Sequence, residues 1–297
     1  AEADLLAEAE ALAADADVVL LFAGSNAEWE GEGADRESMD LPLEQDELIR
    51  RVAAVNSNTV VVLNNGSPLH MPWLHDVAAV MQAWYGGQEA GNAIADVLFG
   101  DADPGGRLPT TFPKRLADNP AYLNYPGENG RVLYGEGLFV GYRYYDAKGI
   151  EALFPFGHGL SFTTFQYLNL QVPRRVQAGE DVRVSVEVEN VGPLAGEEVV
   201  QLYLTDLEAS APIPIRSLQG LERVFLKPGE RRTVSFTLTP RQLSLIDAEW
   251  ERVVEPGEFE VTVGGKQPGF GGLADAATTG VTTAVFRVSG DLLRLPR

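Results

Sequence analysis

The residues whose types and spacing could do chemistry lie close together near the start of the chain. Positions 28–36 read Glu-Trp-Glu-Gly-Glu-Gly-Ala-Asp-Arg, which places four carboxylates, one guanidinium and one indole within nine positions. This acidic loop directly follows an apolar, strand-like segment at 18–24. Open α/β sheets usually hold their reactive groups in the loops after strands, so the pattern indicates acid/base chemistry by paired carboxylates. On residue types alone, a solvated acidic surface is the commoner explanation of such a run.

Composition and charge narrow the class of protein. The 297 residues are 45% hydrophobic, which is typical of a packed globular protein with room for two domains. The 43 acidic residues outnumber the 23 basic ones, so the net field repels phosphate backbones and anionic lipids. We therefore expect a soluble protein that binds neither nucleic acid nor membranes, and whose substrate is neutral.

Cysteine is absent, which excludes disulfides, thiolate metal sites and a cysteine nucleophile. His70 and His75 lack metal-ligand spacing, and the run 101–105 lacks the further ligands of a calcium loop. We expect no metal and no other cofactor. The compartment stays undecided, and a periplasmic or secreted location is one option.

The chain begins at Ala1 with a helix-like acidic segment to Asp15 and without the pattern of a signal peptide. Two interpretations remain open: either a signal peptide has been removed, or the chain is the downstream piece of a longer polypeptide.

The first half of the sequence alternates between helix-like and strand-like patterns. Strands are predicted at 18–23, 59–63 and 77–84, and helices at 45–55 and 89–99. Such alternation predicts a mostly parallel sheet flanked by helices, in a domain spanning 1–167. Three strands make a thin sheet, so we expect a partial α/β sandwich that something outside this chain completes.

In the second half of the sequence, apolar residues recur at every second position. Clean alternation of apolar and polar residues predicts an all-β sandwich over 168–297. Its predicted strands lie at 182–188, 199–204, 233–238, 259–263 and 284–288. The Pro-, Gly- and Tyr-rich stretch between 105 and 165 is expected to be ordered loop wrapped over the sheet domain.

Several motifs follow the acidic loop in order along nearly the whole chain. They are 39–42 (Met-Asp-Leu-Pro), 82–87 (Gln-Ala-Trp-Tyr-Gly-Gly), 91–101 (Gly-Asn-Ala-Ile-Ala-Asp-Val-Leu-Phe-Gly-Asp), 104–109 (Pro-Gly-Gly-Arg-Leu-Pro) and 156–161 (Phe-Gly-His-Gly-Leu-Ser). With these motifs and the trailing sandwich, the sequence resembles the C-terminal part of family 3 glycoside hydrolases, the β-glucosidase group, in which that sandwich is fibronectin type III-like.

The resemblance implies a retaining mechanism with two carboxyl groups. The family's general acid/base corresponds to Glu32, and its nucleophile is an Asp on a (β/α)8 barrel that no stretch of this chain resembles. Retaining glycosidases need one protonated carboxyl group and a second, ionised one about 5–5.5 Å away. We therefore expect a β-glucoside or oligosaccharide substrate with terminal β-D-glucosyl residues, and a second polypeptide or segment that carries the barrel. A higher oligomer is a further option.

The neighbours of Glu32 have less specific expected roles. Trp29 could stack on a sugar or anchor the loop, and Glu30 is a second candidate for substrate binding. Asp35 and Arg36 are expected to pair with each other and support the loop, while Trp84 and Tyr85 are expected to pack. The alternative function is a non-catalytic carbohydrate-binding or scaffolding fragment.

Overall fold

The computed structural model describes residues 2–33 and 36–296. By its internal contacts the chain divides into two compact units, one of residues 1–99 with 113–117 and one of 100–112 with 118–297. Each unit is described by itself below. Within the described residues, every helix falls short of the length and apolarity that crossing a membrane requires.

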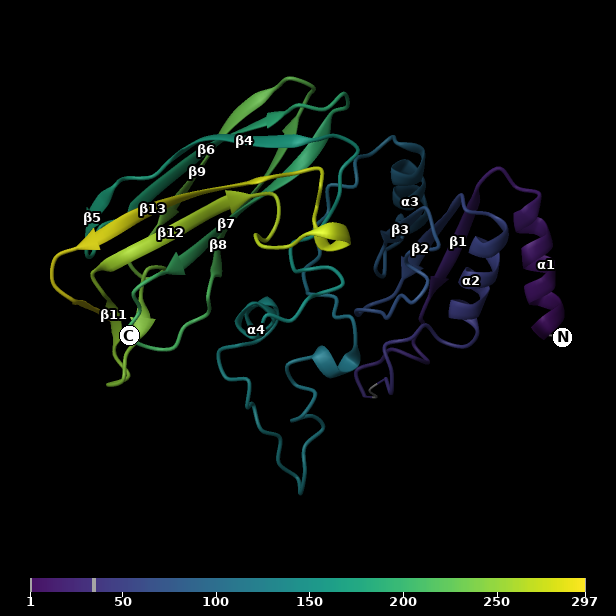
Figure 1. Ribbon diagram of the computed structural model, residues 1–297, viewed down its shortest axis with the longest axis horizontal. Helices are drawn as coiled ribbons and strands as arrows, with labels where there is room; N and C mark the ends of the chain where they lie inside the picture. Colours follow the sequence, from purple (N-terminus) through teal and green to yellow (C-terminus); the bar gives the residue numbers. More distant parts are fainter. Residues whose placement is uncertain (1, 34–35, 297) are drawn as a thin grey trace. The chain divides into compact units, whose positions relative to one another are not determined.

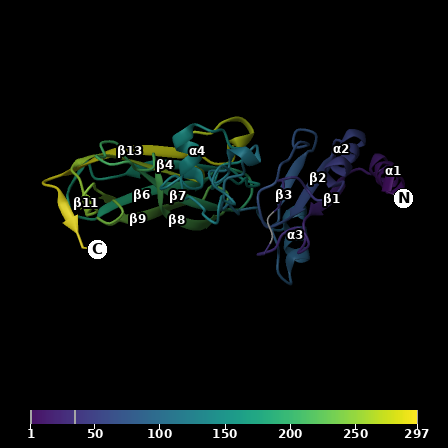
Figure 2. The ribbon, with the colours of Figure 1, turned by 90° about the horizontal axis from the view of Figure 1, so that it is seen from below.

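The first unit is a small parallel sheet with helices. Its strands are ordered β1-β2-β3, and both strand pairs run parallel. In Figure 2, α2 and α3 lie on opposite sides of this sheet. Its elements, in chain order, are α1 (Glu2–Ala14), β1 (Val19–Gly24), α2 (Gln45–Val55), β2 (Thr59–Asn64), β3 (Ala79–Gln82) and α3 (Ala90–Phe99).

The core of this unit lies between α2 and the centre of the sheet. Ile49, Val52 and Ala53 follow helical spacing and are buried, as the amphipathic pattern of α2 requires. On the sheet, Val61 and Leu63 of β2 are fully buried. The predicted α/β fold is confirmed, and each predicted strand and helix in this half matches an observed one within a few residues.

Strand β1 is the least covered part of the sheet. Leu21 and Ala23 are buried, whereas the alternating Leu20 and Phe22 are 40% and 59% exposed. Alternate residues of a strand point to opposite faces, so one face of β1 is apolar and open. Parallel sheets are normally covered on both faces. The prediction that something outside the chain completes this sheet agrees with the open face and stays a prediction.

The second unit is a β-sandwich (Figure 1). A five-stranded sheet, β5-β13-β12-β7-β8, and a three-stranded sheet, β4-β6-β9, form its layers, and β10-β11-β14 form a small third sheet. The elements are α4 (Tyr142–Lys148), β4 (Phe165–Gln171), β5 (Arg175–Gln177), β6 (Val182–Asn190), β7 (Gly196–Asp206), β8 (Ser217–Leu226), β9 (Arg231–Leu238), β10 (Leu245–Ile246), β11 (Arg252–Val254), β12 (Gly257–Gly264), β13 (Val281–Ser289) and β14 (Leu293–Leu295), with short 3-10 turns at Leu116–Asp118 and Gly272–Ala274.

The sandwich core follows directly from the period-two pattern. In β6, Val182, Val184, Val186 and Val188 are buried, while the residues between them are more exposed. They pack with side chains of the other sheet such as Phe259 in one continuous hydrophobic cluster. The predicted all-β region is thus confirmed, and all five of its predicted strands are present.

The stretch 105–165 is expected from the sequence to wrap over the sheet domain, but by its internal contacts most of it belongs to the sandwich unit. The reason is a polar anchor that composition does not reveal: Arg107 Nη2 donates to Glu198 Oε2 of β7 at 3.0 Å, and the two side chains are only 6% and 0% exposed. Tyr167 Oη and Thr279 Oγ1 donate to the other oxygen of Glu198.

A second anchor holds the same segment. Asp103 Oδ1 accepts hydrogen bonds from Ser161 Oγ and the Phe162 amide, and its Oδ2 accepts one from the Glu197 amide. The segments around Asp103 and Ser161 are thereby held to each other and to the start of β7. The predicted domain limits, 1–167 and 168–297, stay predictions. The compact units divide the chain differently, and β4 begins at Phe165, just before the predicted boundary.

Candidate functional site

The candidate site is built where the three parallel strands end. Parallel strands end at the same edge of a sheet, so the residues after β1, β2 and β3 meet there. The chain leaves β1 through Ser25 and makes a tight turn, in which the amides of Trp29 and Glu30 donate to the Asn26 carbonyl. The Asn26 side chain also accepts from the Glu28 amide, as asparagine commonly does in turns.

Glu30 is the centre of this site. Its Oε1 accepts from Ser67 Oγ at 2.6 Å and from Arg36 Nη1 at 3.0 Å. Its Oε2 accepts from the Gly66 amide at 2.7 Å and from Tyr85 Oη at 2.8 Å. Segments after all three strands thus converge on one carboxylate.

The electrostatics of Glu30 follow from these contacts. Burial alone would raise its pKa, but the hydrogen bonds from Ser67, Tyr85 and Gly66 and the charge of Arg36 together hold the pKa below its usual value. Burial, with the adjacent carboxylate, raises the pKa of Tyr85. Glu30 is therefore an ionised acceptor and Tyr85 a neutral donor.

The predicted acid/base residue, Glu32, lies on the exposed part of the same loop. It follows Glu30 by two residues, and Gly31 and Gly33 beside it are exposed as well. Trp29, predicted either to stack on a sugar or to anchor the loop, is 44% exposed. The roles predicted for Glu32 and Trp29 stay predictions.

Arg36 supports the loop through contacts with Glu30 and Pro68. Its guanidinium donates to Glu30 and, through Nη2, to the Pro68 carbonyl at 2.9 Å, and its side chain is 16% exposed. Asp35, the predicted partner, lies outside the described residues. Within the described residues, the loop-supporting ion pair of Arg36 is made with Glu30, and the pairing expected with Asp35 stays a prediction.

Sequence reasoning missed two members of this site. Ser67 belongs to a turn that the sequence marks only by Gly66 and Pro68. Tyr85 is expected from the sequence to pack against other side chains, but it is 49% exposed and donates a hydrogen bond to Glu30. The sequence does contain a signal that could have found them, because both residues follow predicted strands of the same parallel sheet. Residues in that position are expected to lie together at the edge of the sheet where the strands end.

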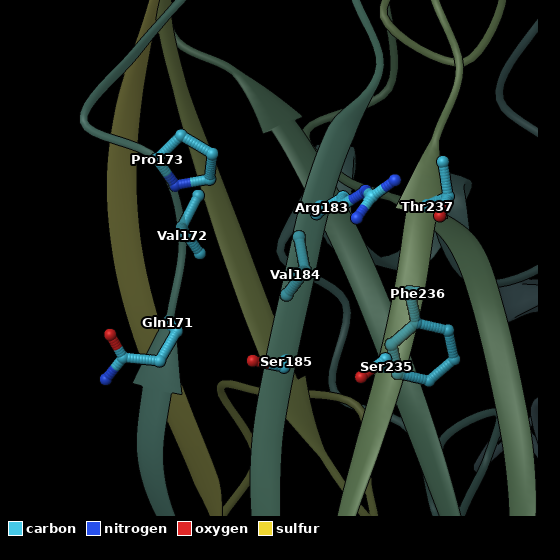
Figure 3. Close-up of a pocket in the computed structure, with 9 residues that line it drawn as sticks. All are labelled: Gln171, Val172, Pro173, Arg183, Val184, Ser185, Ser235, Phe236 and Thr237. Atoms are coloured by element: carbon cyan, nitrogen blue, oxygen red, sulfur yellow. The ribbon is translucent and has the colours of Figure 1, made fainter.

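Other parts of the chain offer weaker sites. No cluster of three or more His, Cys, Asp or Glu side chains suited to a metal ion occurs within 2–33 and 36–296. A groove of about 560 Å³ lies on the sandwich, next to the irregular end of β4 (Figure 3). Phe236 is the one aromatic side chain that lines it, and it includes no carboxylate. The groove thus lacks the paired acids that glycoside chemistry requires.

Two family models match the chain, and together they define its class. Residues 2–142 match the glycosyl hydrolase family 3 C-terminal domain, and residues 198–267 match the fibronectin type III-like domain. The chain belongs to glycosyl hydrolase family 3 and carries these two domains of it. This confirms the resemblance on which the sequence analysis relied.

The individual relatives are β-glucosidases. The chain is 51% identical to thermostable beta-glucosidase B of Acetivibrio thermocellus over 265 residues, which are 88% of this chain and 35% of that protein. It is 48% identical to probable beta-glucosidase I of Aspergillus terreus, with 88% of this chain and 32% of that protein covered. The chain therefore spans about a third of the length of these relatives.

Solved structures agree with these sequence matches. The crystal structure of a β-glucosidase from Kluyveromyces marxianus in complex with glucose superimposes with a TM-score of 0.90 at 42% identity. The superposition covers 99% of this chain and 34% of that one. A family 3 β-glucosidase from Bifidobacterium adolescentis superimposes with a TM-score of 0.89 at 39% identity, covering 99% of this chain and 42% of that one.

Proposed function

We propose that this chain supplies the general acid/base, Glu32, of a retaining β-glucosidase that hydrolyses terminal β-D-glucosyl residues. The nucleophile, an Asp on a (β/α)8 barrel, comes from another polypeptide or segment. The observation that carries the proposal is the position of Glu32: it is exposed on a fixed loop at the carboxyl edge of a parallel sheet, in a chain of glycosyl hydrolase family 3.

In the proposed mechanism each of the two carboxyl groups has its own role. Protonated Glu32 donates its proton to the glycosidic oxygen while the barrel Asp attacks the sugar, and a covalent glycosyl-enzyme forms as the alcohol leaves. Glu32, now a carboxylate, then takes a proton from water, which attacks the sugar and releases glucose. Trp29, which lies in this loop and is partly exposed, is the proposed stacking surface for the sugar.

The partner is tested first. Residues 1–297 alone are expected not to hydrolyse aryl β-glucosides, and addition of the barrel-bearing polypeptide is expected to restore turnover. Substantial turnover by the chain alone would refute the need for a partner. Sugar binding by the chain with no turnover in any combination would favour a carbohydrate-binding fragment instead.

Glu32 is tested in the assembled enzyme by Glu32→Ala. Loss of a general acid costs about 10²–10⁴-fold, and the loss should be largest for substrates with poor leaving groups. Added azide should restore turnover of activated substrates by attacking the glycosyl-enzyme without needing a base. Glu28→Ala, at another exposed glutamate of the same loop, is the control. Unchanged kinetics of Glu32→Ala would remove Glu32 from the mechanism.

A further inference from the structure

The carboxylate of Glu30 has no free capacity to bind a ligand. An ionised carboxylate offers about four acceptor positions, two on each oxygen. In this structure Ser67, Arg36, Gly66 and Tyr85 fill four of them, with donor–acceptor distances of 2.6, 3.0, 2.7 and 2.8 Å. These contacts are internal to the protein, so a substrate hydroxyl would have to displace one of them.

The surroundings of Glu30 are shaped for this arrangement. A Cβ on residue 66 would lie 2.8 Å from Glu30 Oε2 and 2.9 Å from Tyr85 Cε2, so glycine is needed for the close approach. Tyr85 Oη lies 2.9 Å from Ser25 Oγ as well, which ties the first residue after β1 to the same centre. The Glu30 side chain is 11% exposed, a depth at which its charge needs these partners.

The contacts of Glu30 bear on Glu32 through the backbone. Arg36 and Glu30 are six residues apart, and their ion pair joins the two ends of the segment that contains Glu32. One end is held to the turns after β2 and β3 through Glu30, and the other is held to the Pro68 carbonyl through Arg36. Glu32 therefore occupies a short loop whose ends are fixed to the sheet and to each other.

We propose that Glu30 is a positioning residue for Glu32: by accepting hydrogen bonds from the turns after β2 and β3 and from Arg36, it holds the Glu32 carboxyl group where proton transfer to the glycosidic oxygen takes place. This inference rests on the proposed function of Glu32. It replaces substrate binding as the role of Glu30, because the acceptor positions of Glu30 are occupied.

The test is Glu30→Gln in the assembled enzyme, compared with Glu28→Gln. Each variant removes one negative charge from a glutamate within four residues of Glu32, where Glu28 is exposed and Glu30 nearly buried. Only Glu30→Gln replaces one of the two accepting oxygens of the convergent contacts by an NH2 group, which cannot accept. Each is assayed with two aryl β-glucosides, one with a poor leaving group that needs the acid and one with an activated leaving group that does not. Inhibition by glucose measures ground-state binding.

The expected result separates positioning from the other roles. Glu30→Gln should lower kcat/KM for the poor leaving group by roughly 10²-fold, the scale for about 1 Å of misplacement, while the activated substrate loses far less. The inhibition constant for glucose should stay within about threefold of wild type, a shift of under 1 kcal/mol. Tyr85→Phe removes one of the four donors and should show the same pattern at smaller amplitude. Glu28→Gln should leave both substrates near wild type.

The outcomes distinguish this inference from the proposed function. If Glu32→Ala leaves the kinetics unchanged, the proposed acid/base role of Glu32 and the positioning role of Glu30 are both refuted. If Glu32→Ala is severe but Glu30→Gln and Tyr85→Phe match Glu28→Gln, or lose both substrates equally, the positioning role alone is refuted. Weaker inhibition by glucose with an equal loss for both substrates would instead return Glu30 to substrate binding. A Glu30→Gln protein that does not fold leaves the decision to Tyr85→Phe, whose surface position makes it the milder change.

Discussion

The ion pair between Arg107 and Glu198 offers the sharpest test of the forces that hold the sandwich unit together. Glu198 is fully buried and Arg107 nearly so. Arg107→Met keeps an unbranched side chain of similar length but leaves the Glu198 carboxylate buried without its counter-charge. Removing one partner of a buried pair costs about 3–5 kcal/mol. For a unit of this size that corresponds to a loss of about 6–20 °C in Tm, at roughly 2–4 °C per kcal/mol.

The loss should depend on pH. Burial raises the pKa of Glu198, and Arg107, with Tyr167 and Thr279, opposes that rise. Without Arg107 the pKa rises further, so the folded variant holds a proton that the unfolded chain, with a pKa near its usual value, releases. Arg107→Met should therefore be closest to wild type in acid, lose stability as the pH rises through the interval between those two pKa values, and lose no more above it.

The assay is native-state hydrogen exchange of the β7 and β12 amides across pH, which reports on the sandwich unit. Arg223→Met is the matched control, because Arg223 pairs with Glu197, the neighbour of Glu198, at the exposed surface and should matter little. In a double-mutant cycle, Arg107→Met with Glu198→Gln should recover much of the lost stability. A loss below about 1 kcal/mol at neutral pH, or no recovery in the double variant, would refute the reasoning.

Two further substitutions test the polar anchor and the close approach at the site. Asp103→Ala leaves the Ser161 hydroxyl and two amides without their acceptor and should lower the free energy of unfolding of the sandwich unit by about 2–3 kcal/mol in urea titrations. The exposed neighbour Asp101→Ala should change little, and equal effects of the two would contradict the anchor. Gly66→Ala forces a Cβ against Glu30 and Tyr85, so we expect overpacking of about 1–3 kcal/mol and faster amide exchange at 27–33. Gly87→Ala, where nothing lies within 4 Å of the added Cβ, is the control, and identical exchange in both variants would count against the close approach.

The sequence predicted periodic elements well and long-range polar contacts poorly. The alternating valines of β6 and the helical spacing of α2 are local signals that tertiary packing reinforces. Strand β8 was missed because Gly220 and the charged residues Glu222 and Arg223 interrupt its alternation. Its pairing with β7 decides its conformation instead.

The candidate site likewise combines local patterns that the sequence predicts with long-range contacts that it does not. The acidic loop and its position after a strand follow from the sequence, since both are local patterns. The ion pair of Arg36 with Glu30 does not, because no local pattern indicates a contact between two loop side chains six residues apart. The donors from Ser67 and Tyr85 lie 37 and 55 residues away from Glu30, and the fold alone brings them to it.

The open face of β1 affects how any experiment on the separate chain is interpreted. Leu20 and Phe22 sit on β1, which within residues 2–33 and 36–296 pairs only with β2 and so forms the edge of its sheet. Such edges readily accept a strand from another molecule. Aggregates formed by pairing of β1 edges in a concentrated sample would be inactive for reasons unrelated to a missing nucleophile. Light scattering at several dilutions therefore belongs beside the turnover measurement, so that self-association is not mistaken for an incomplete active site.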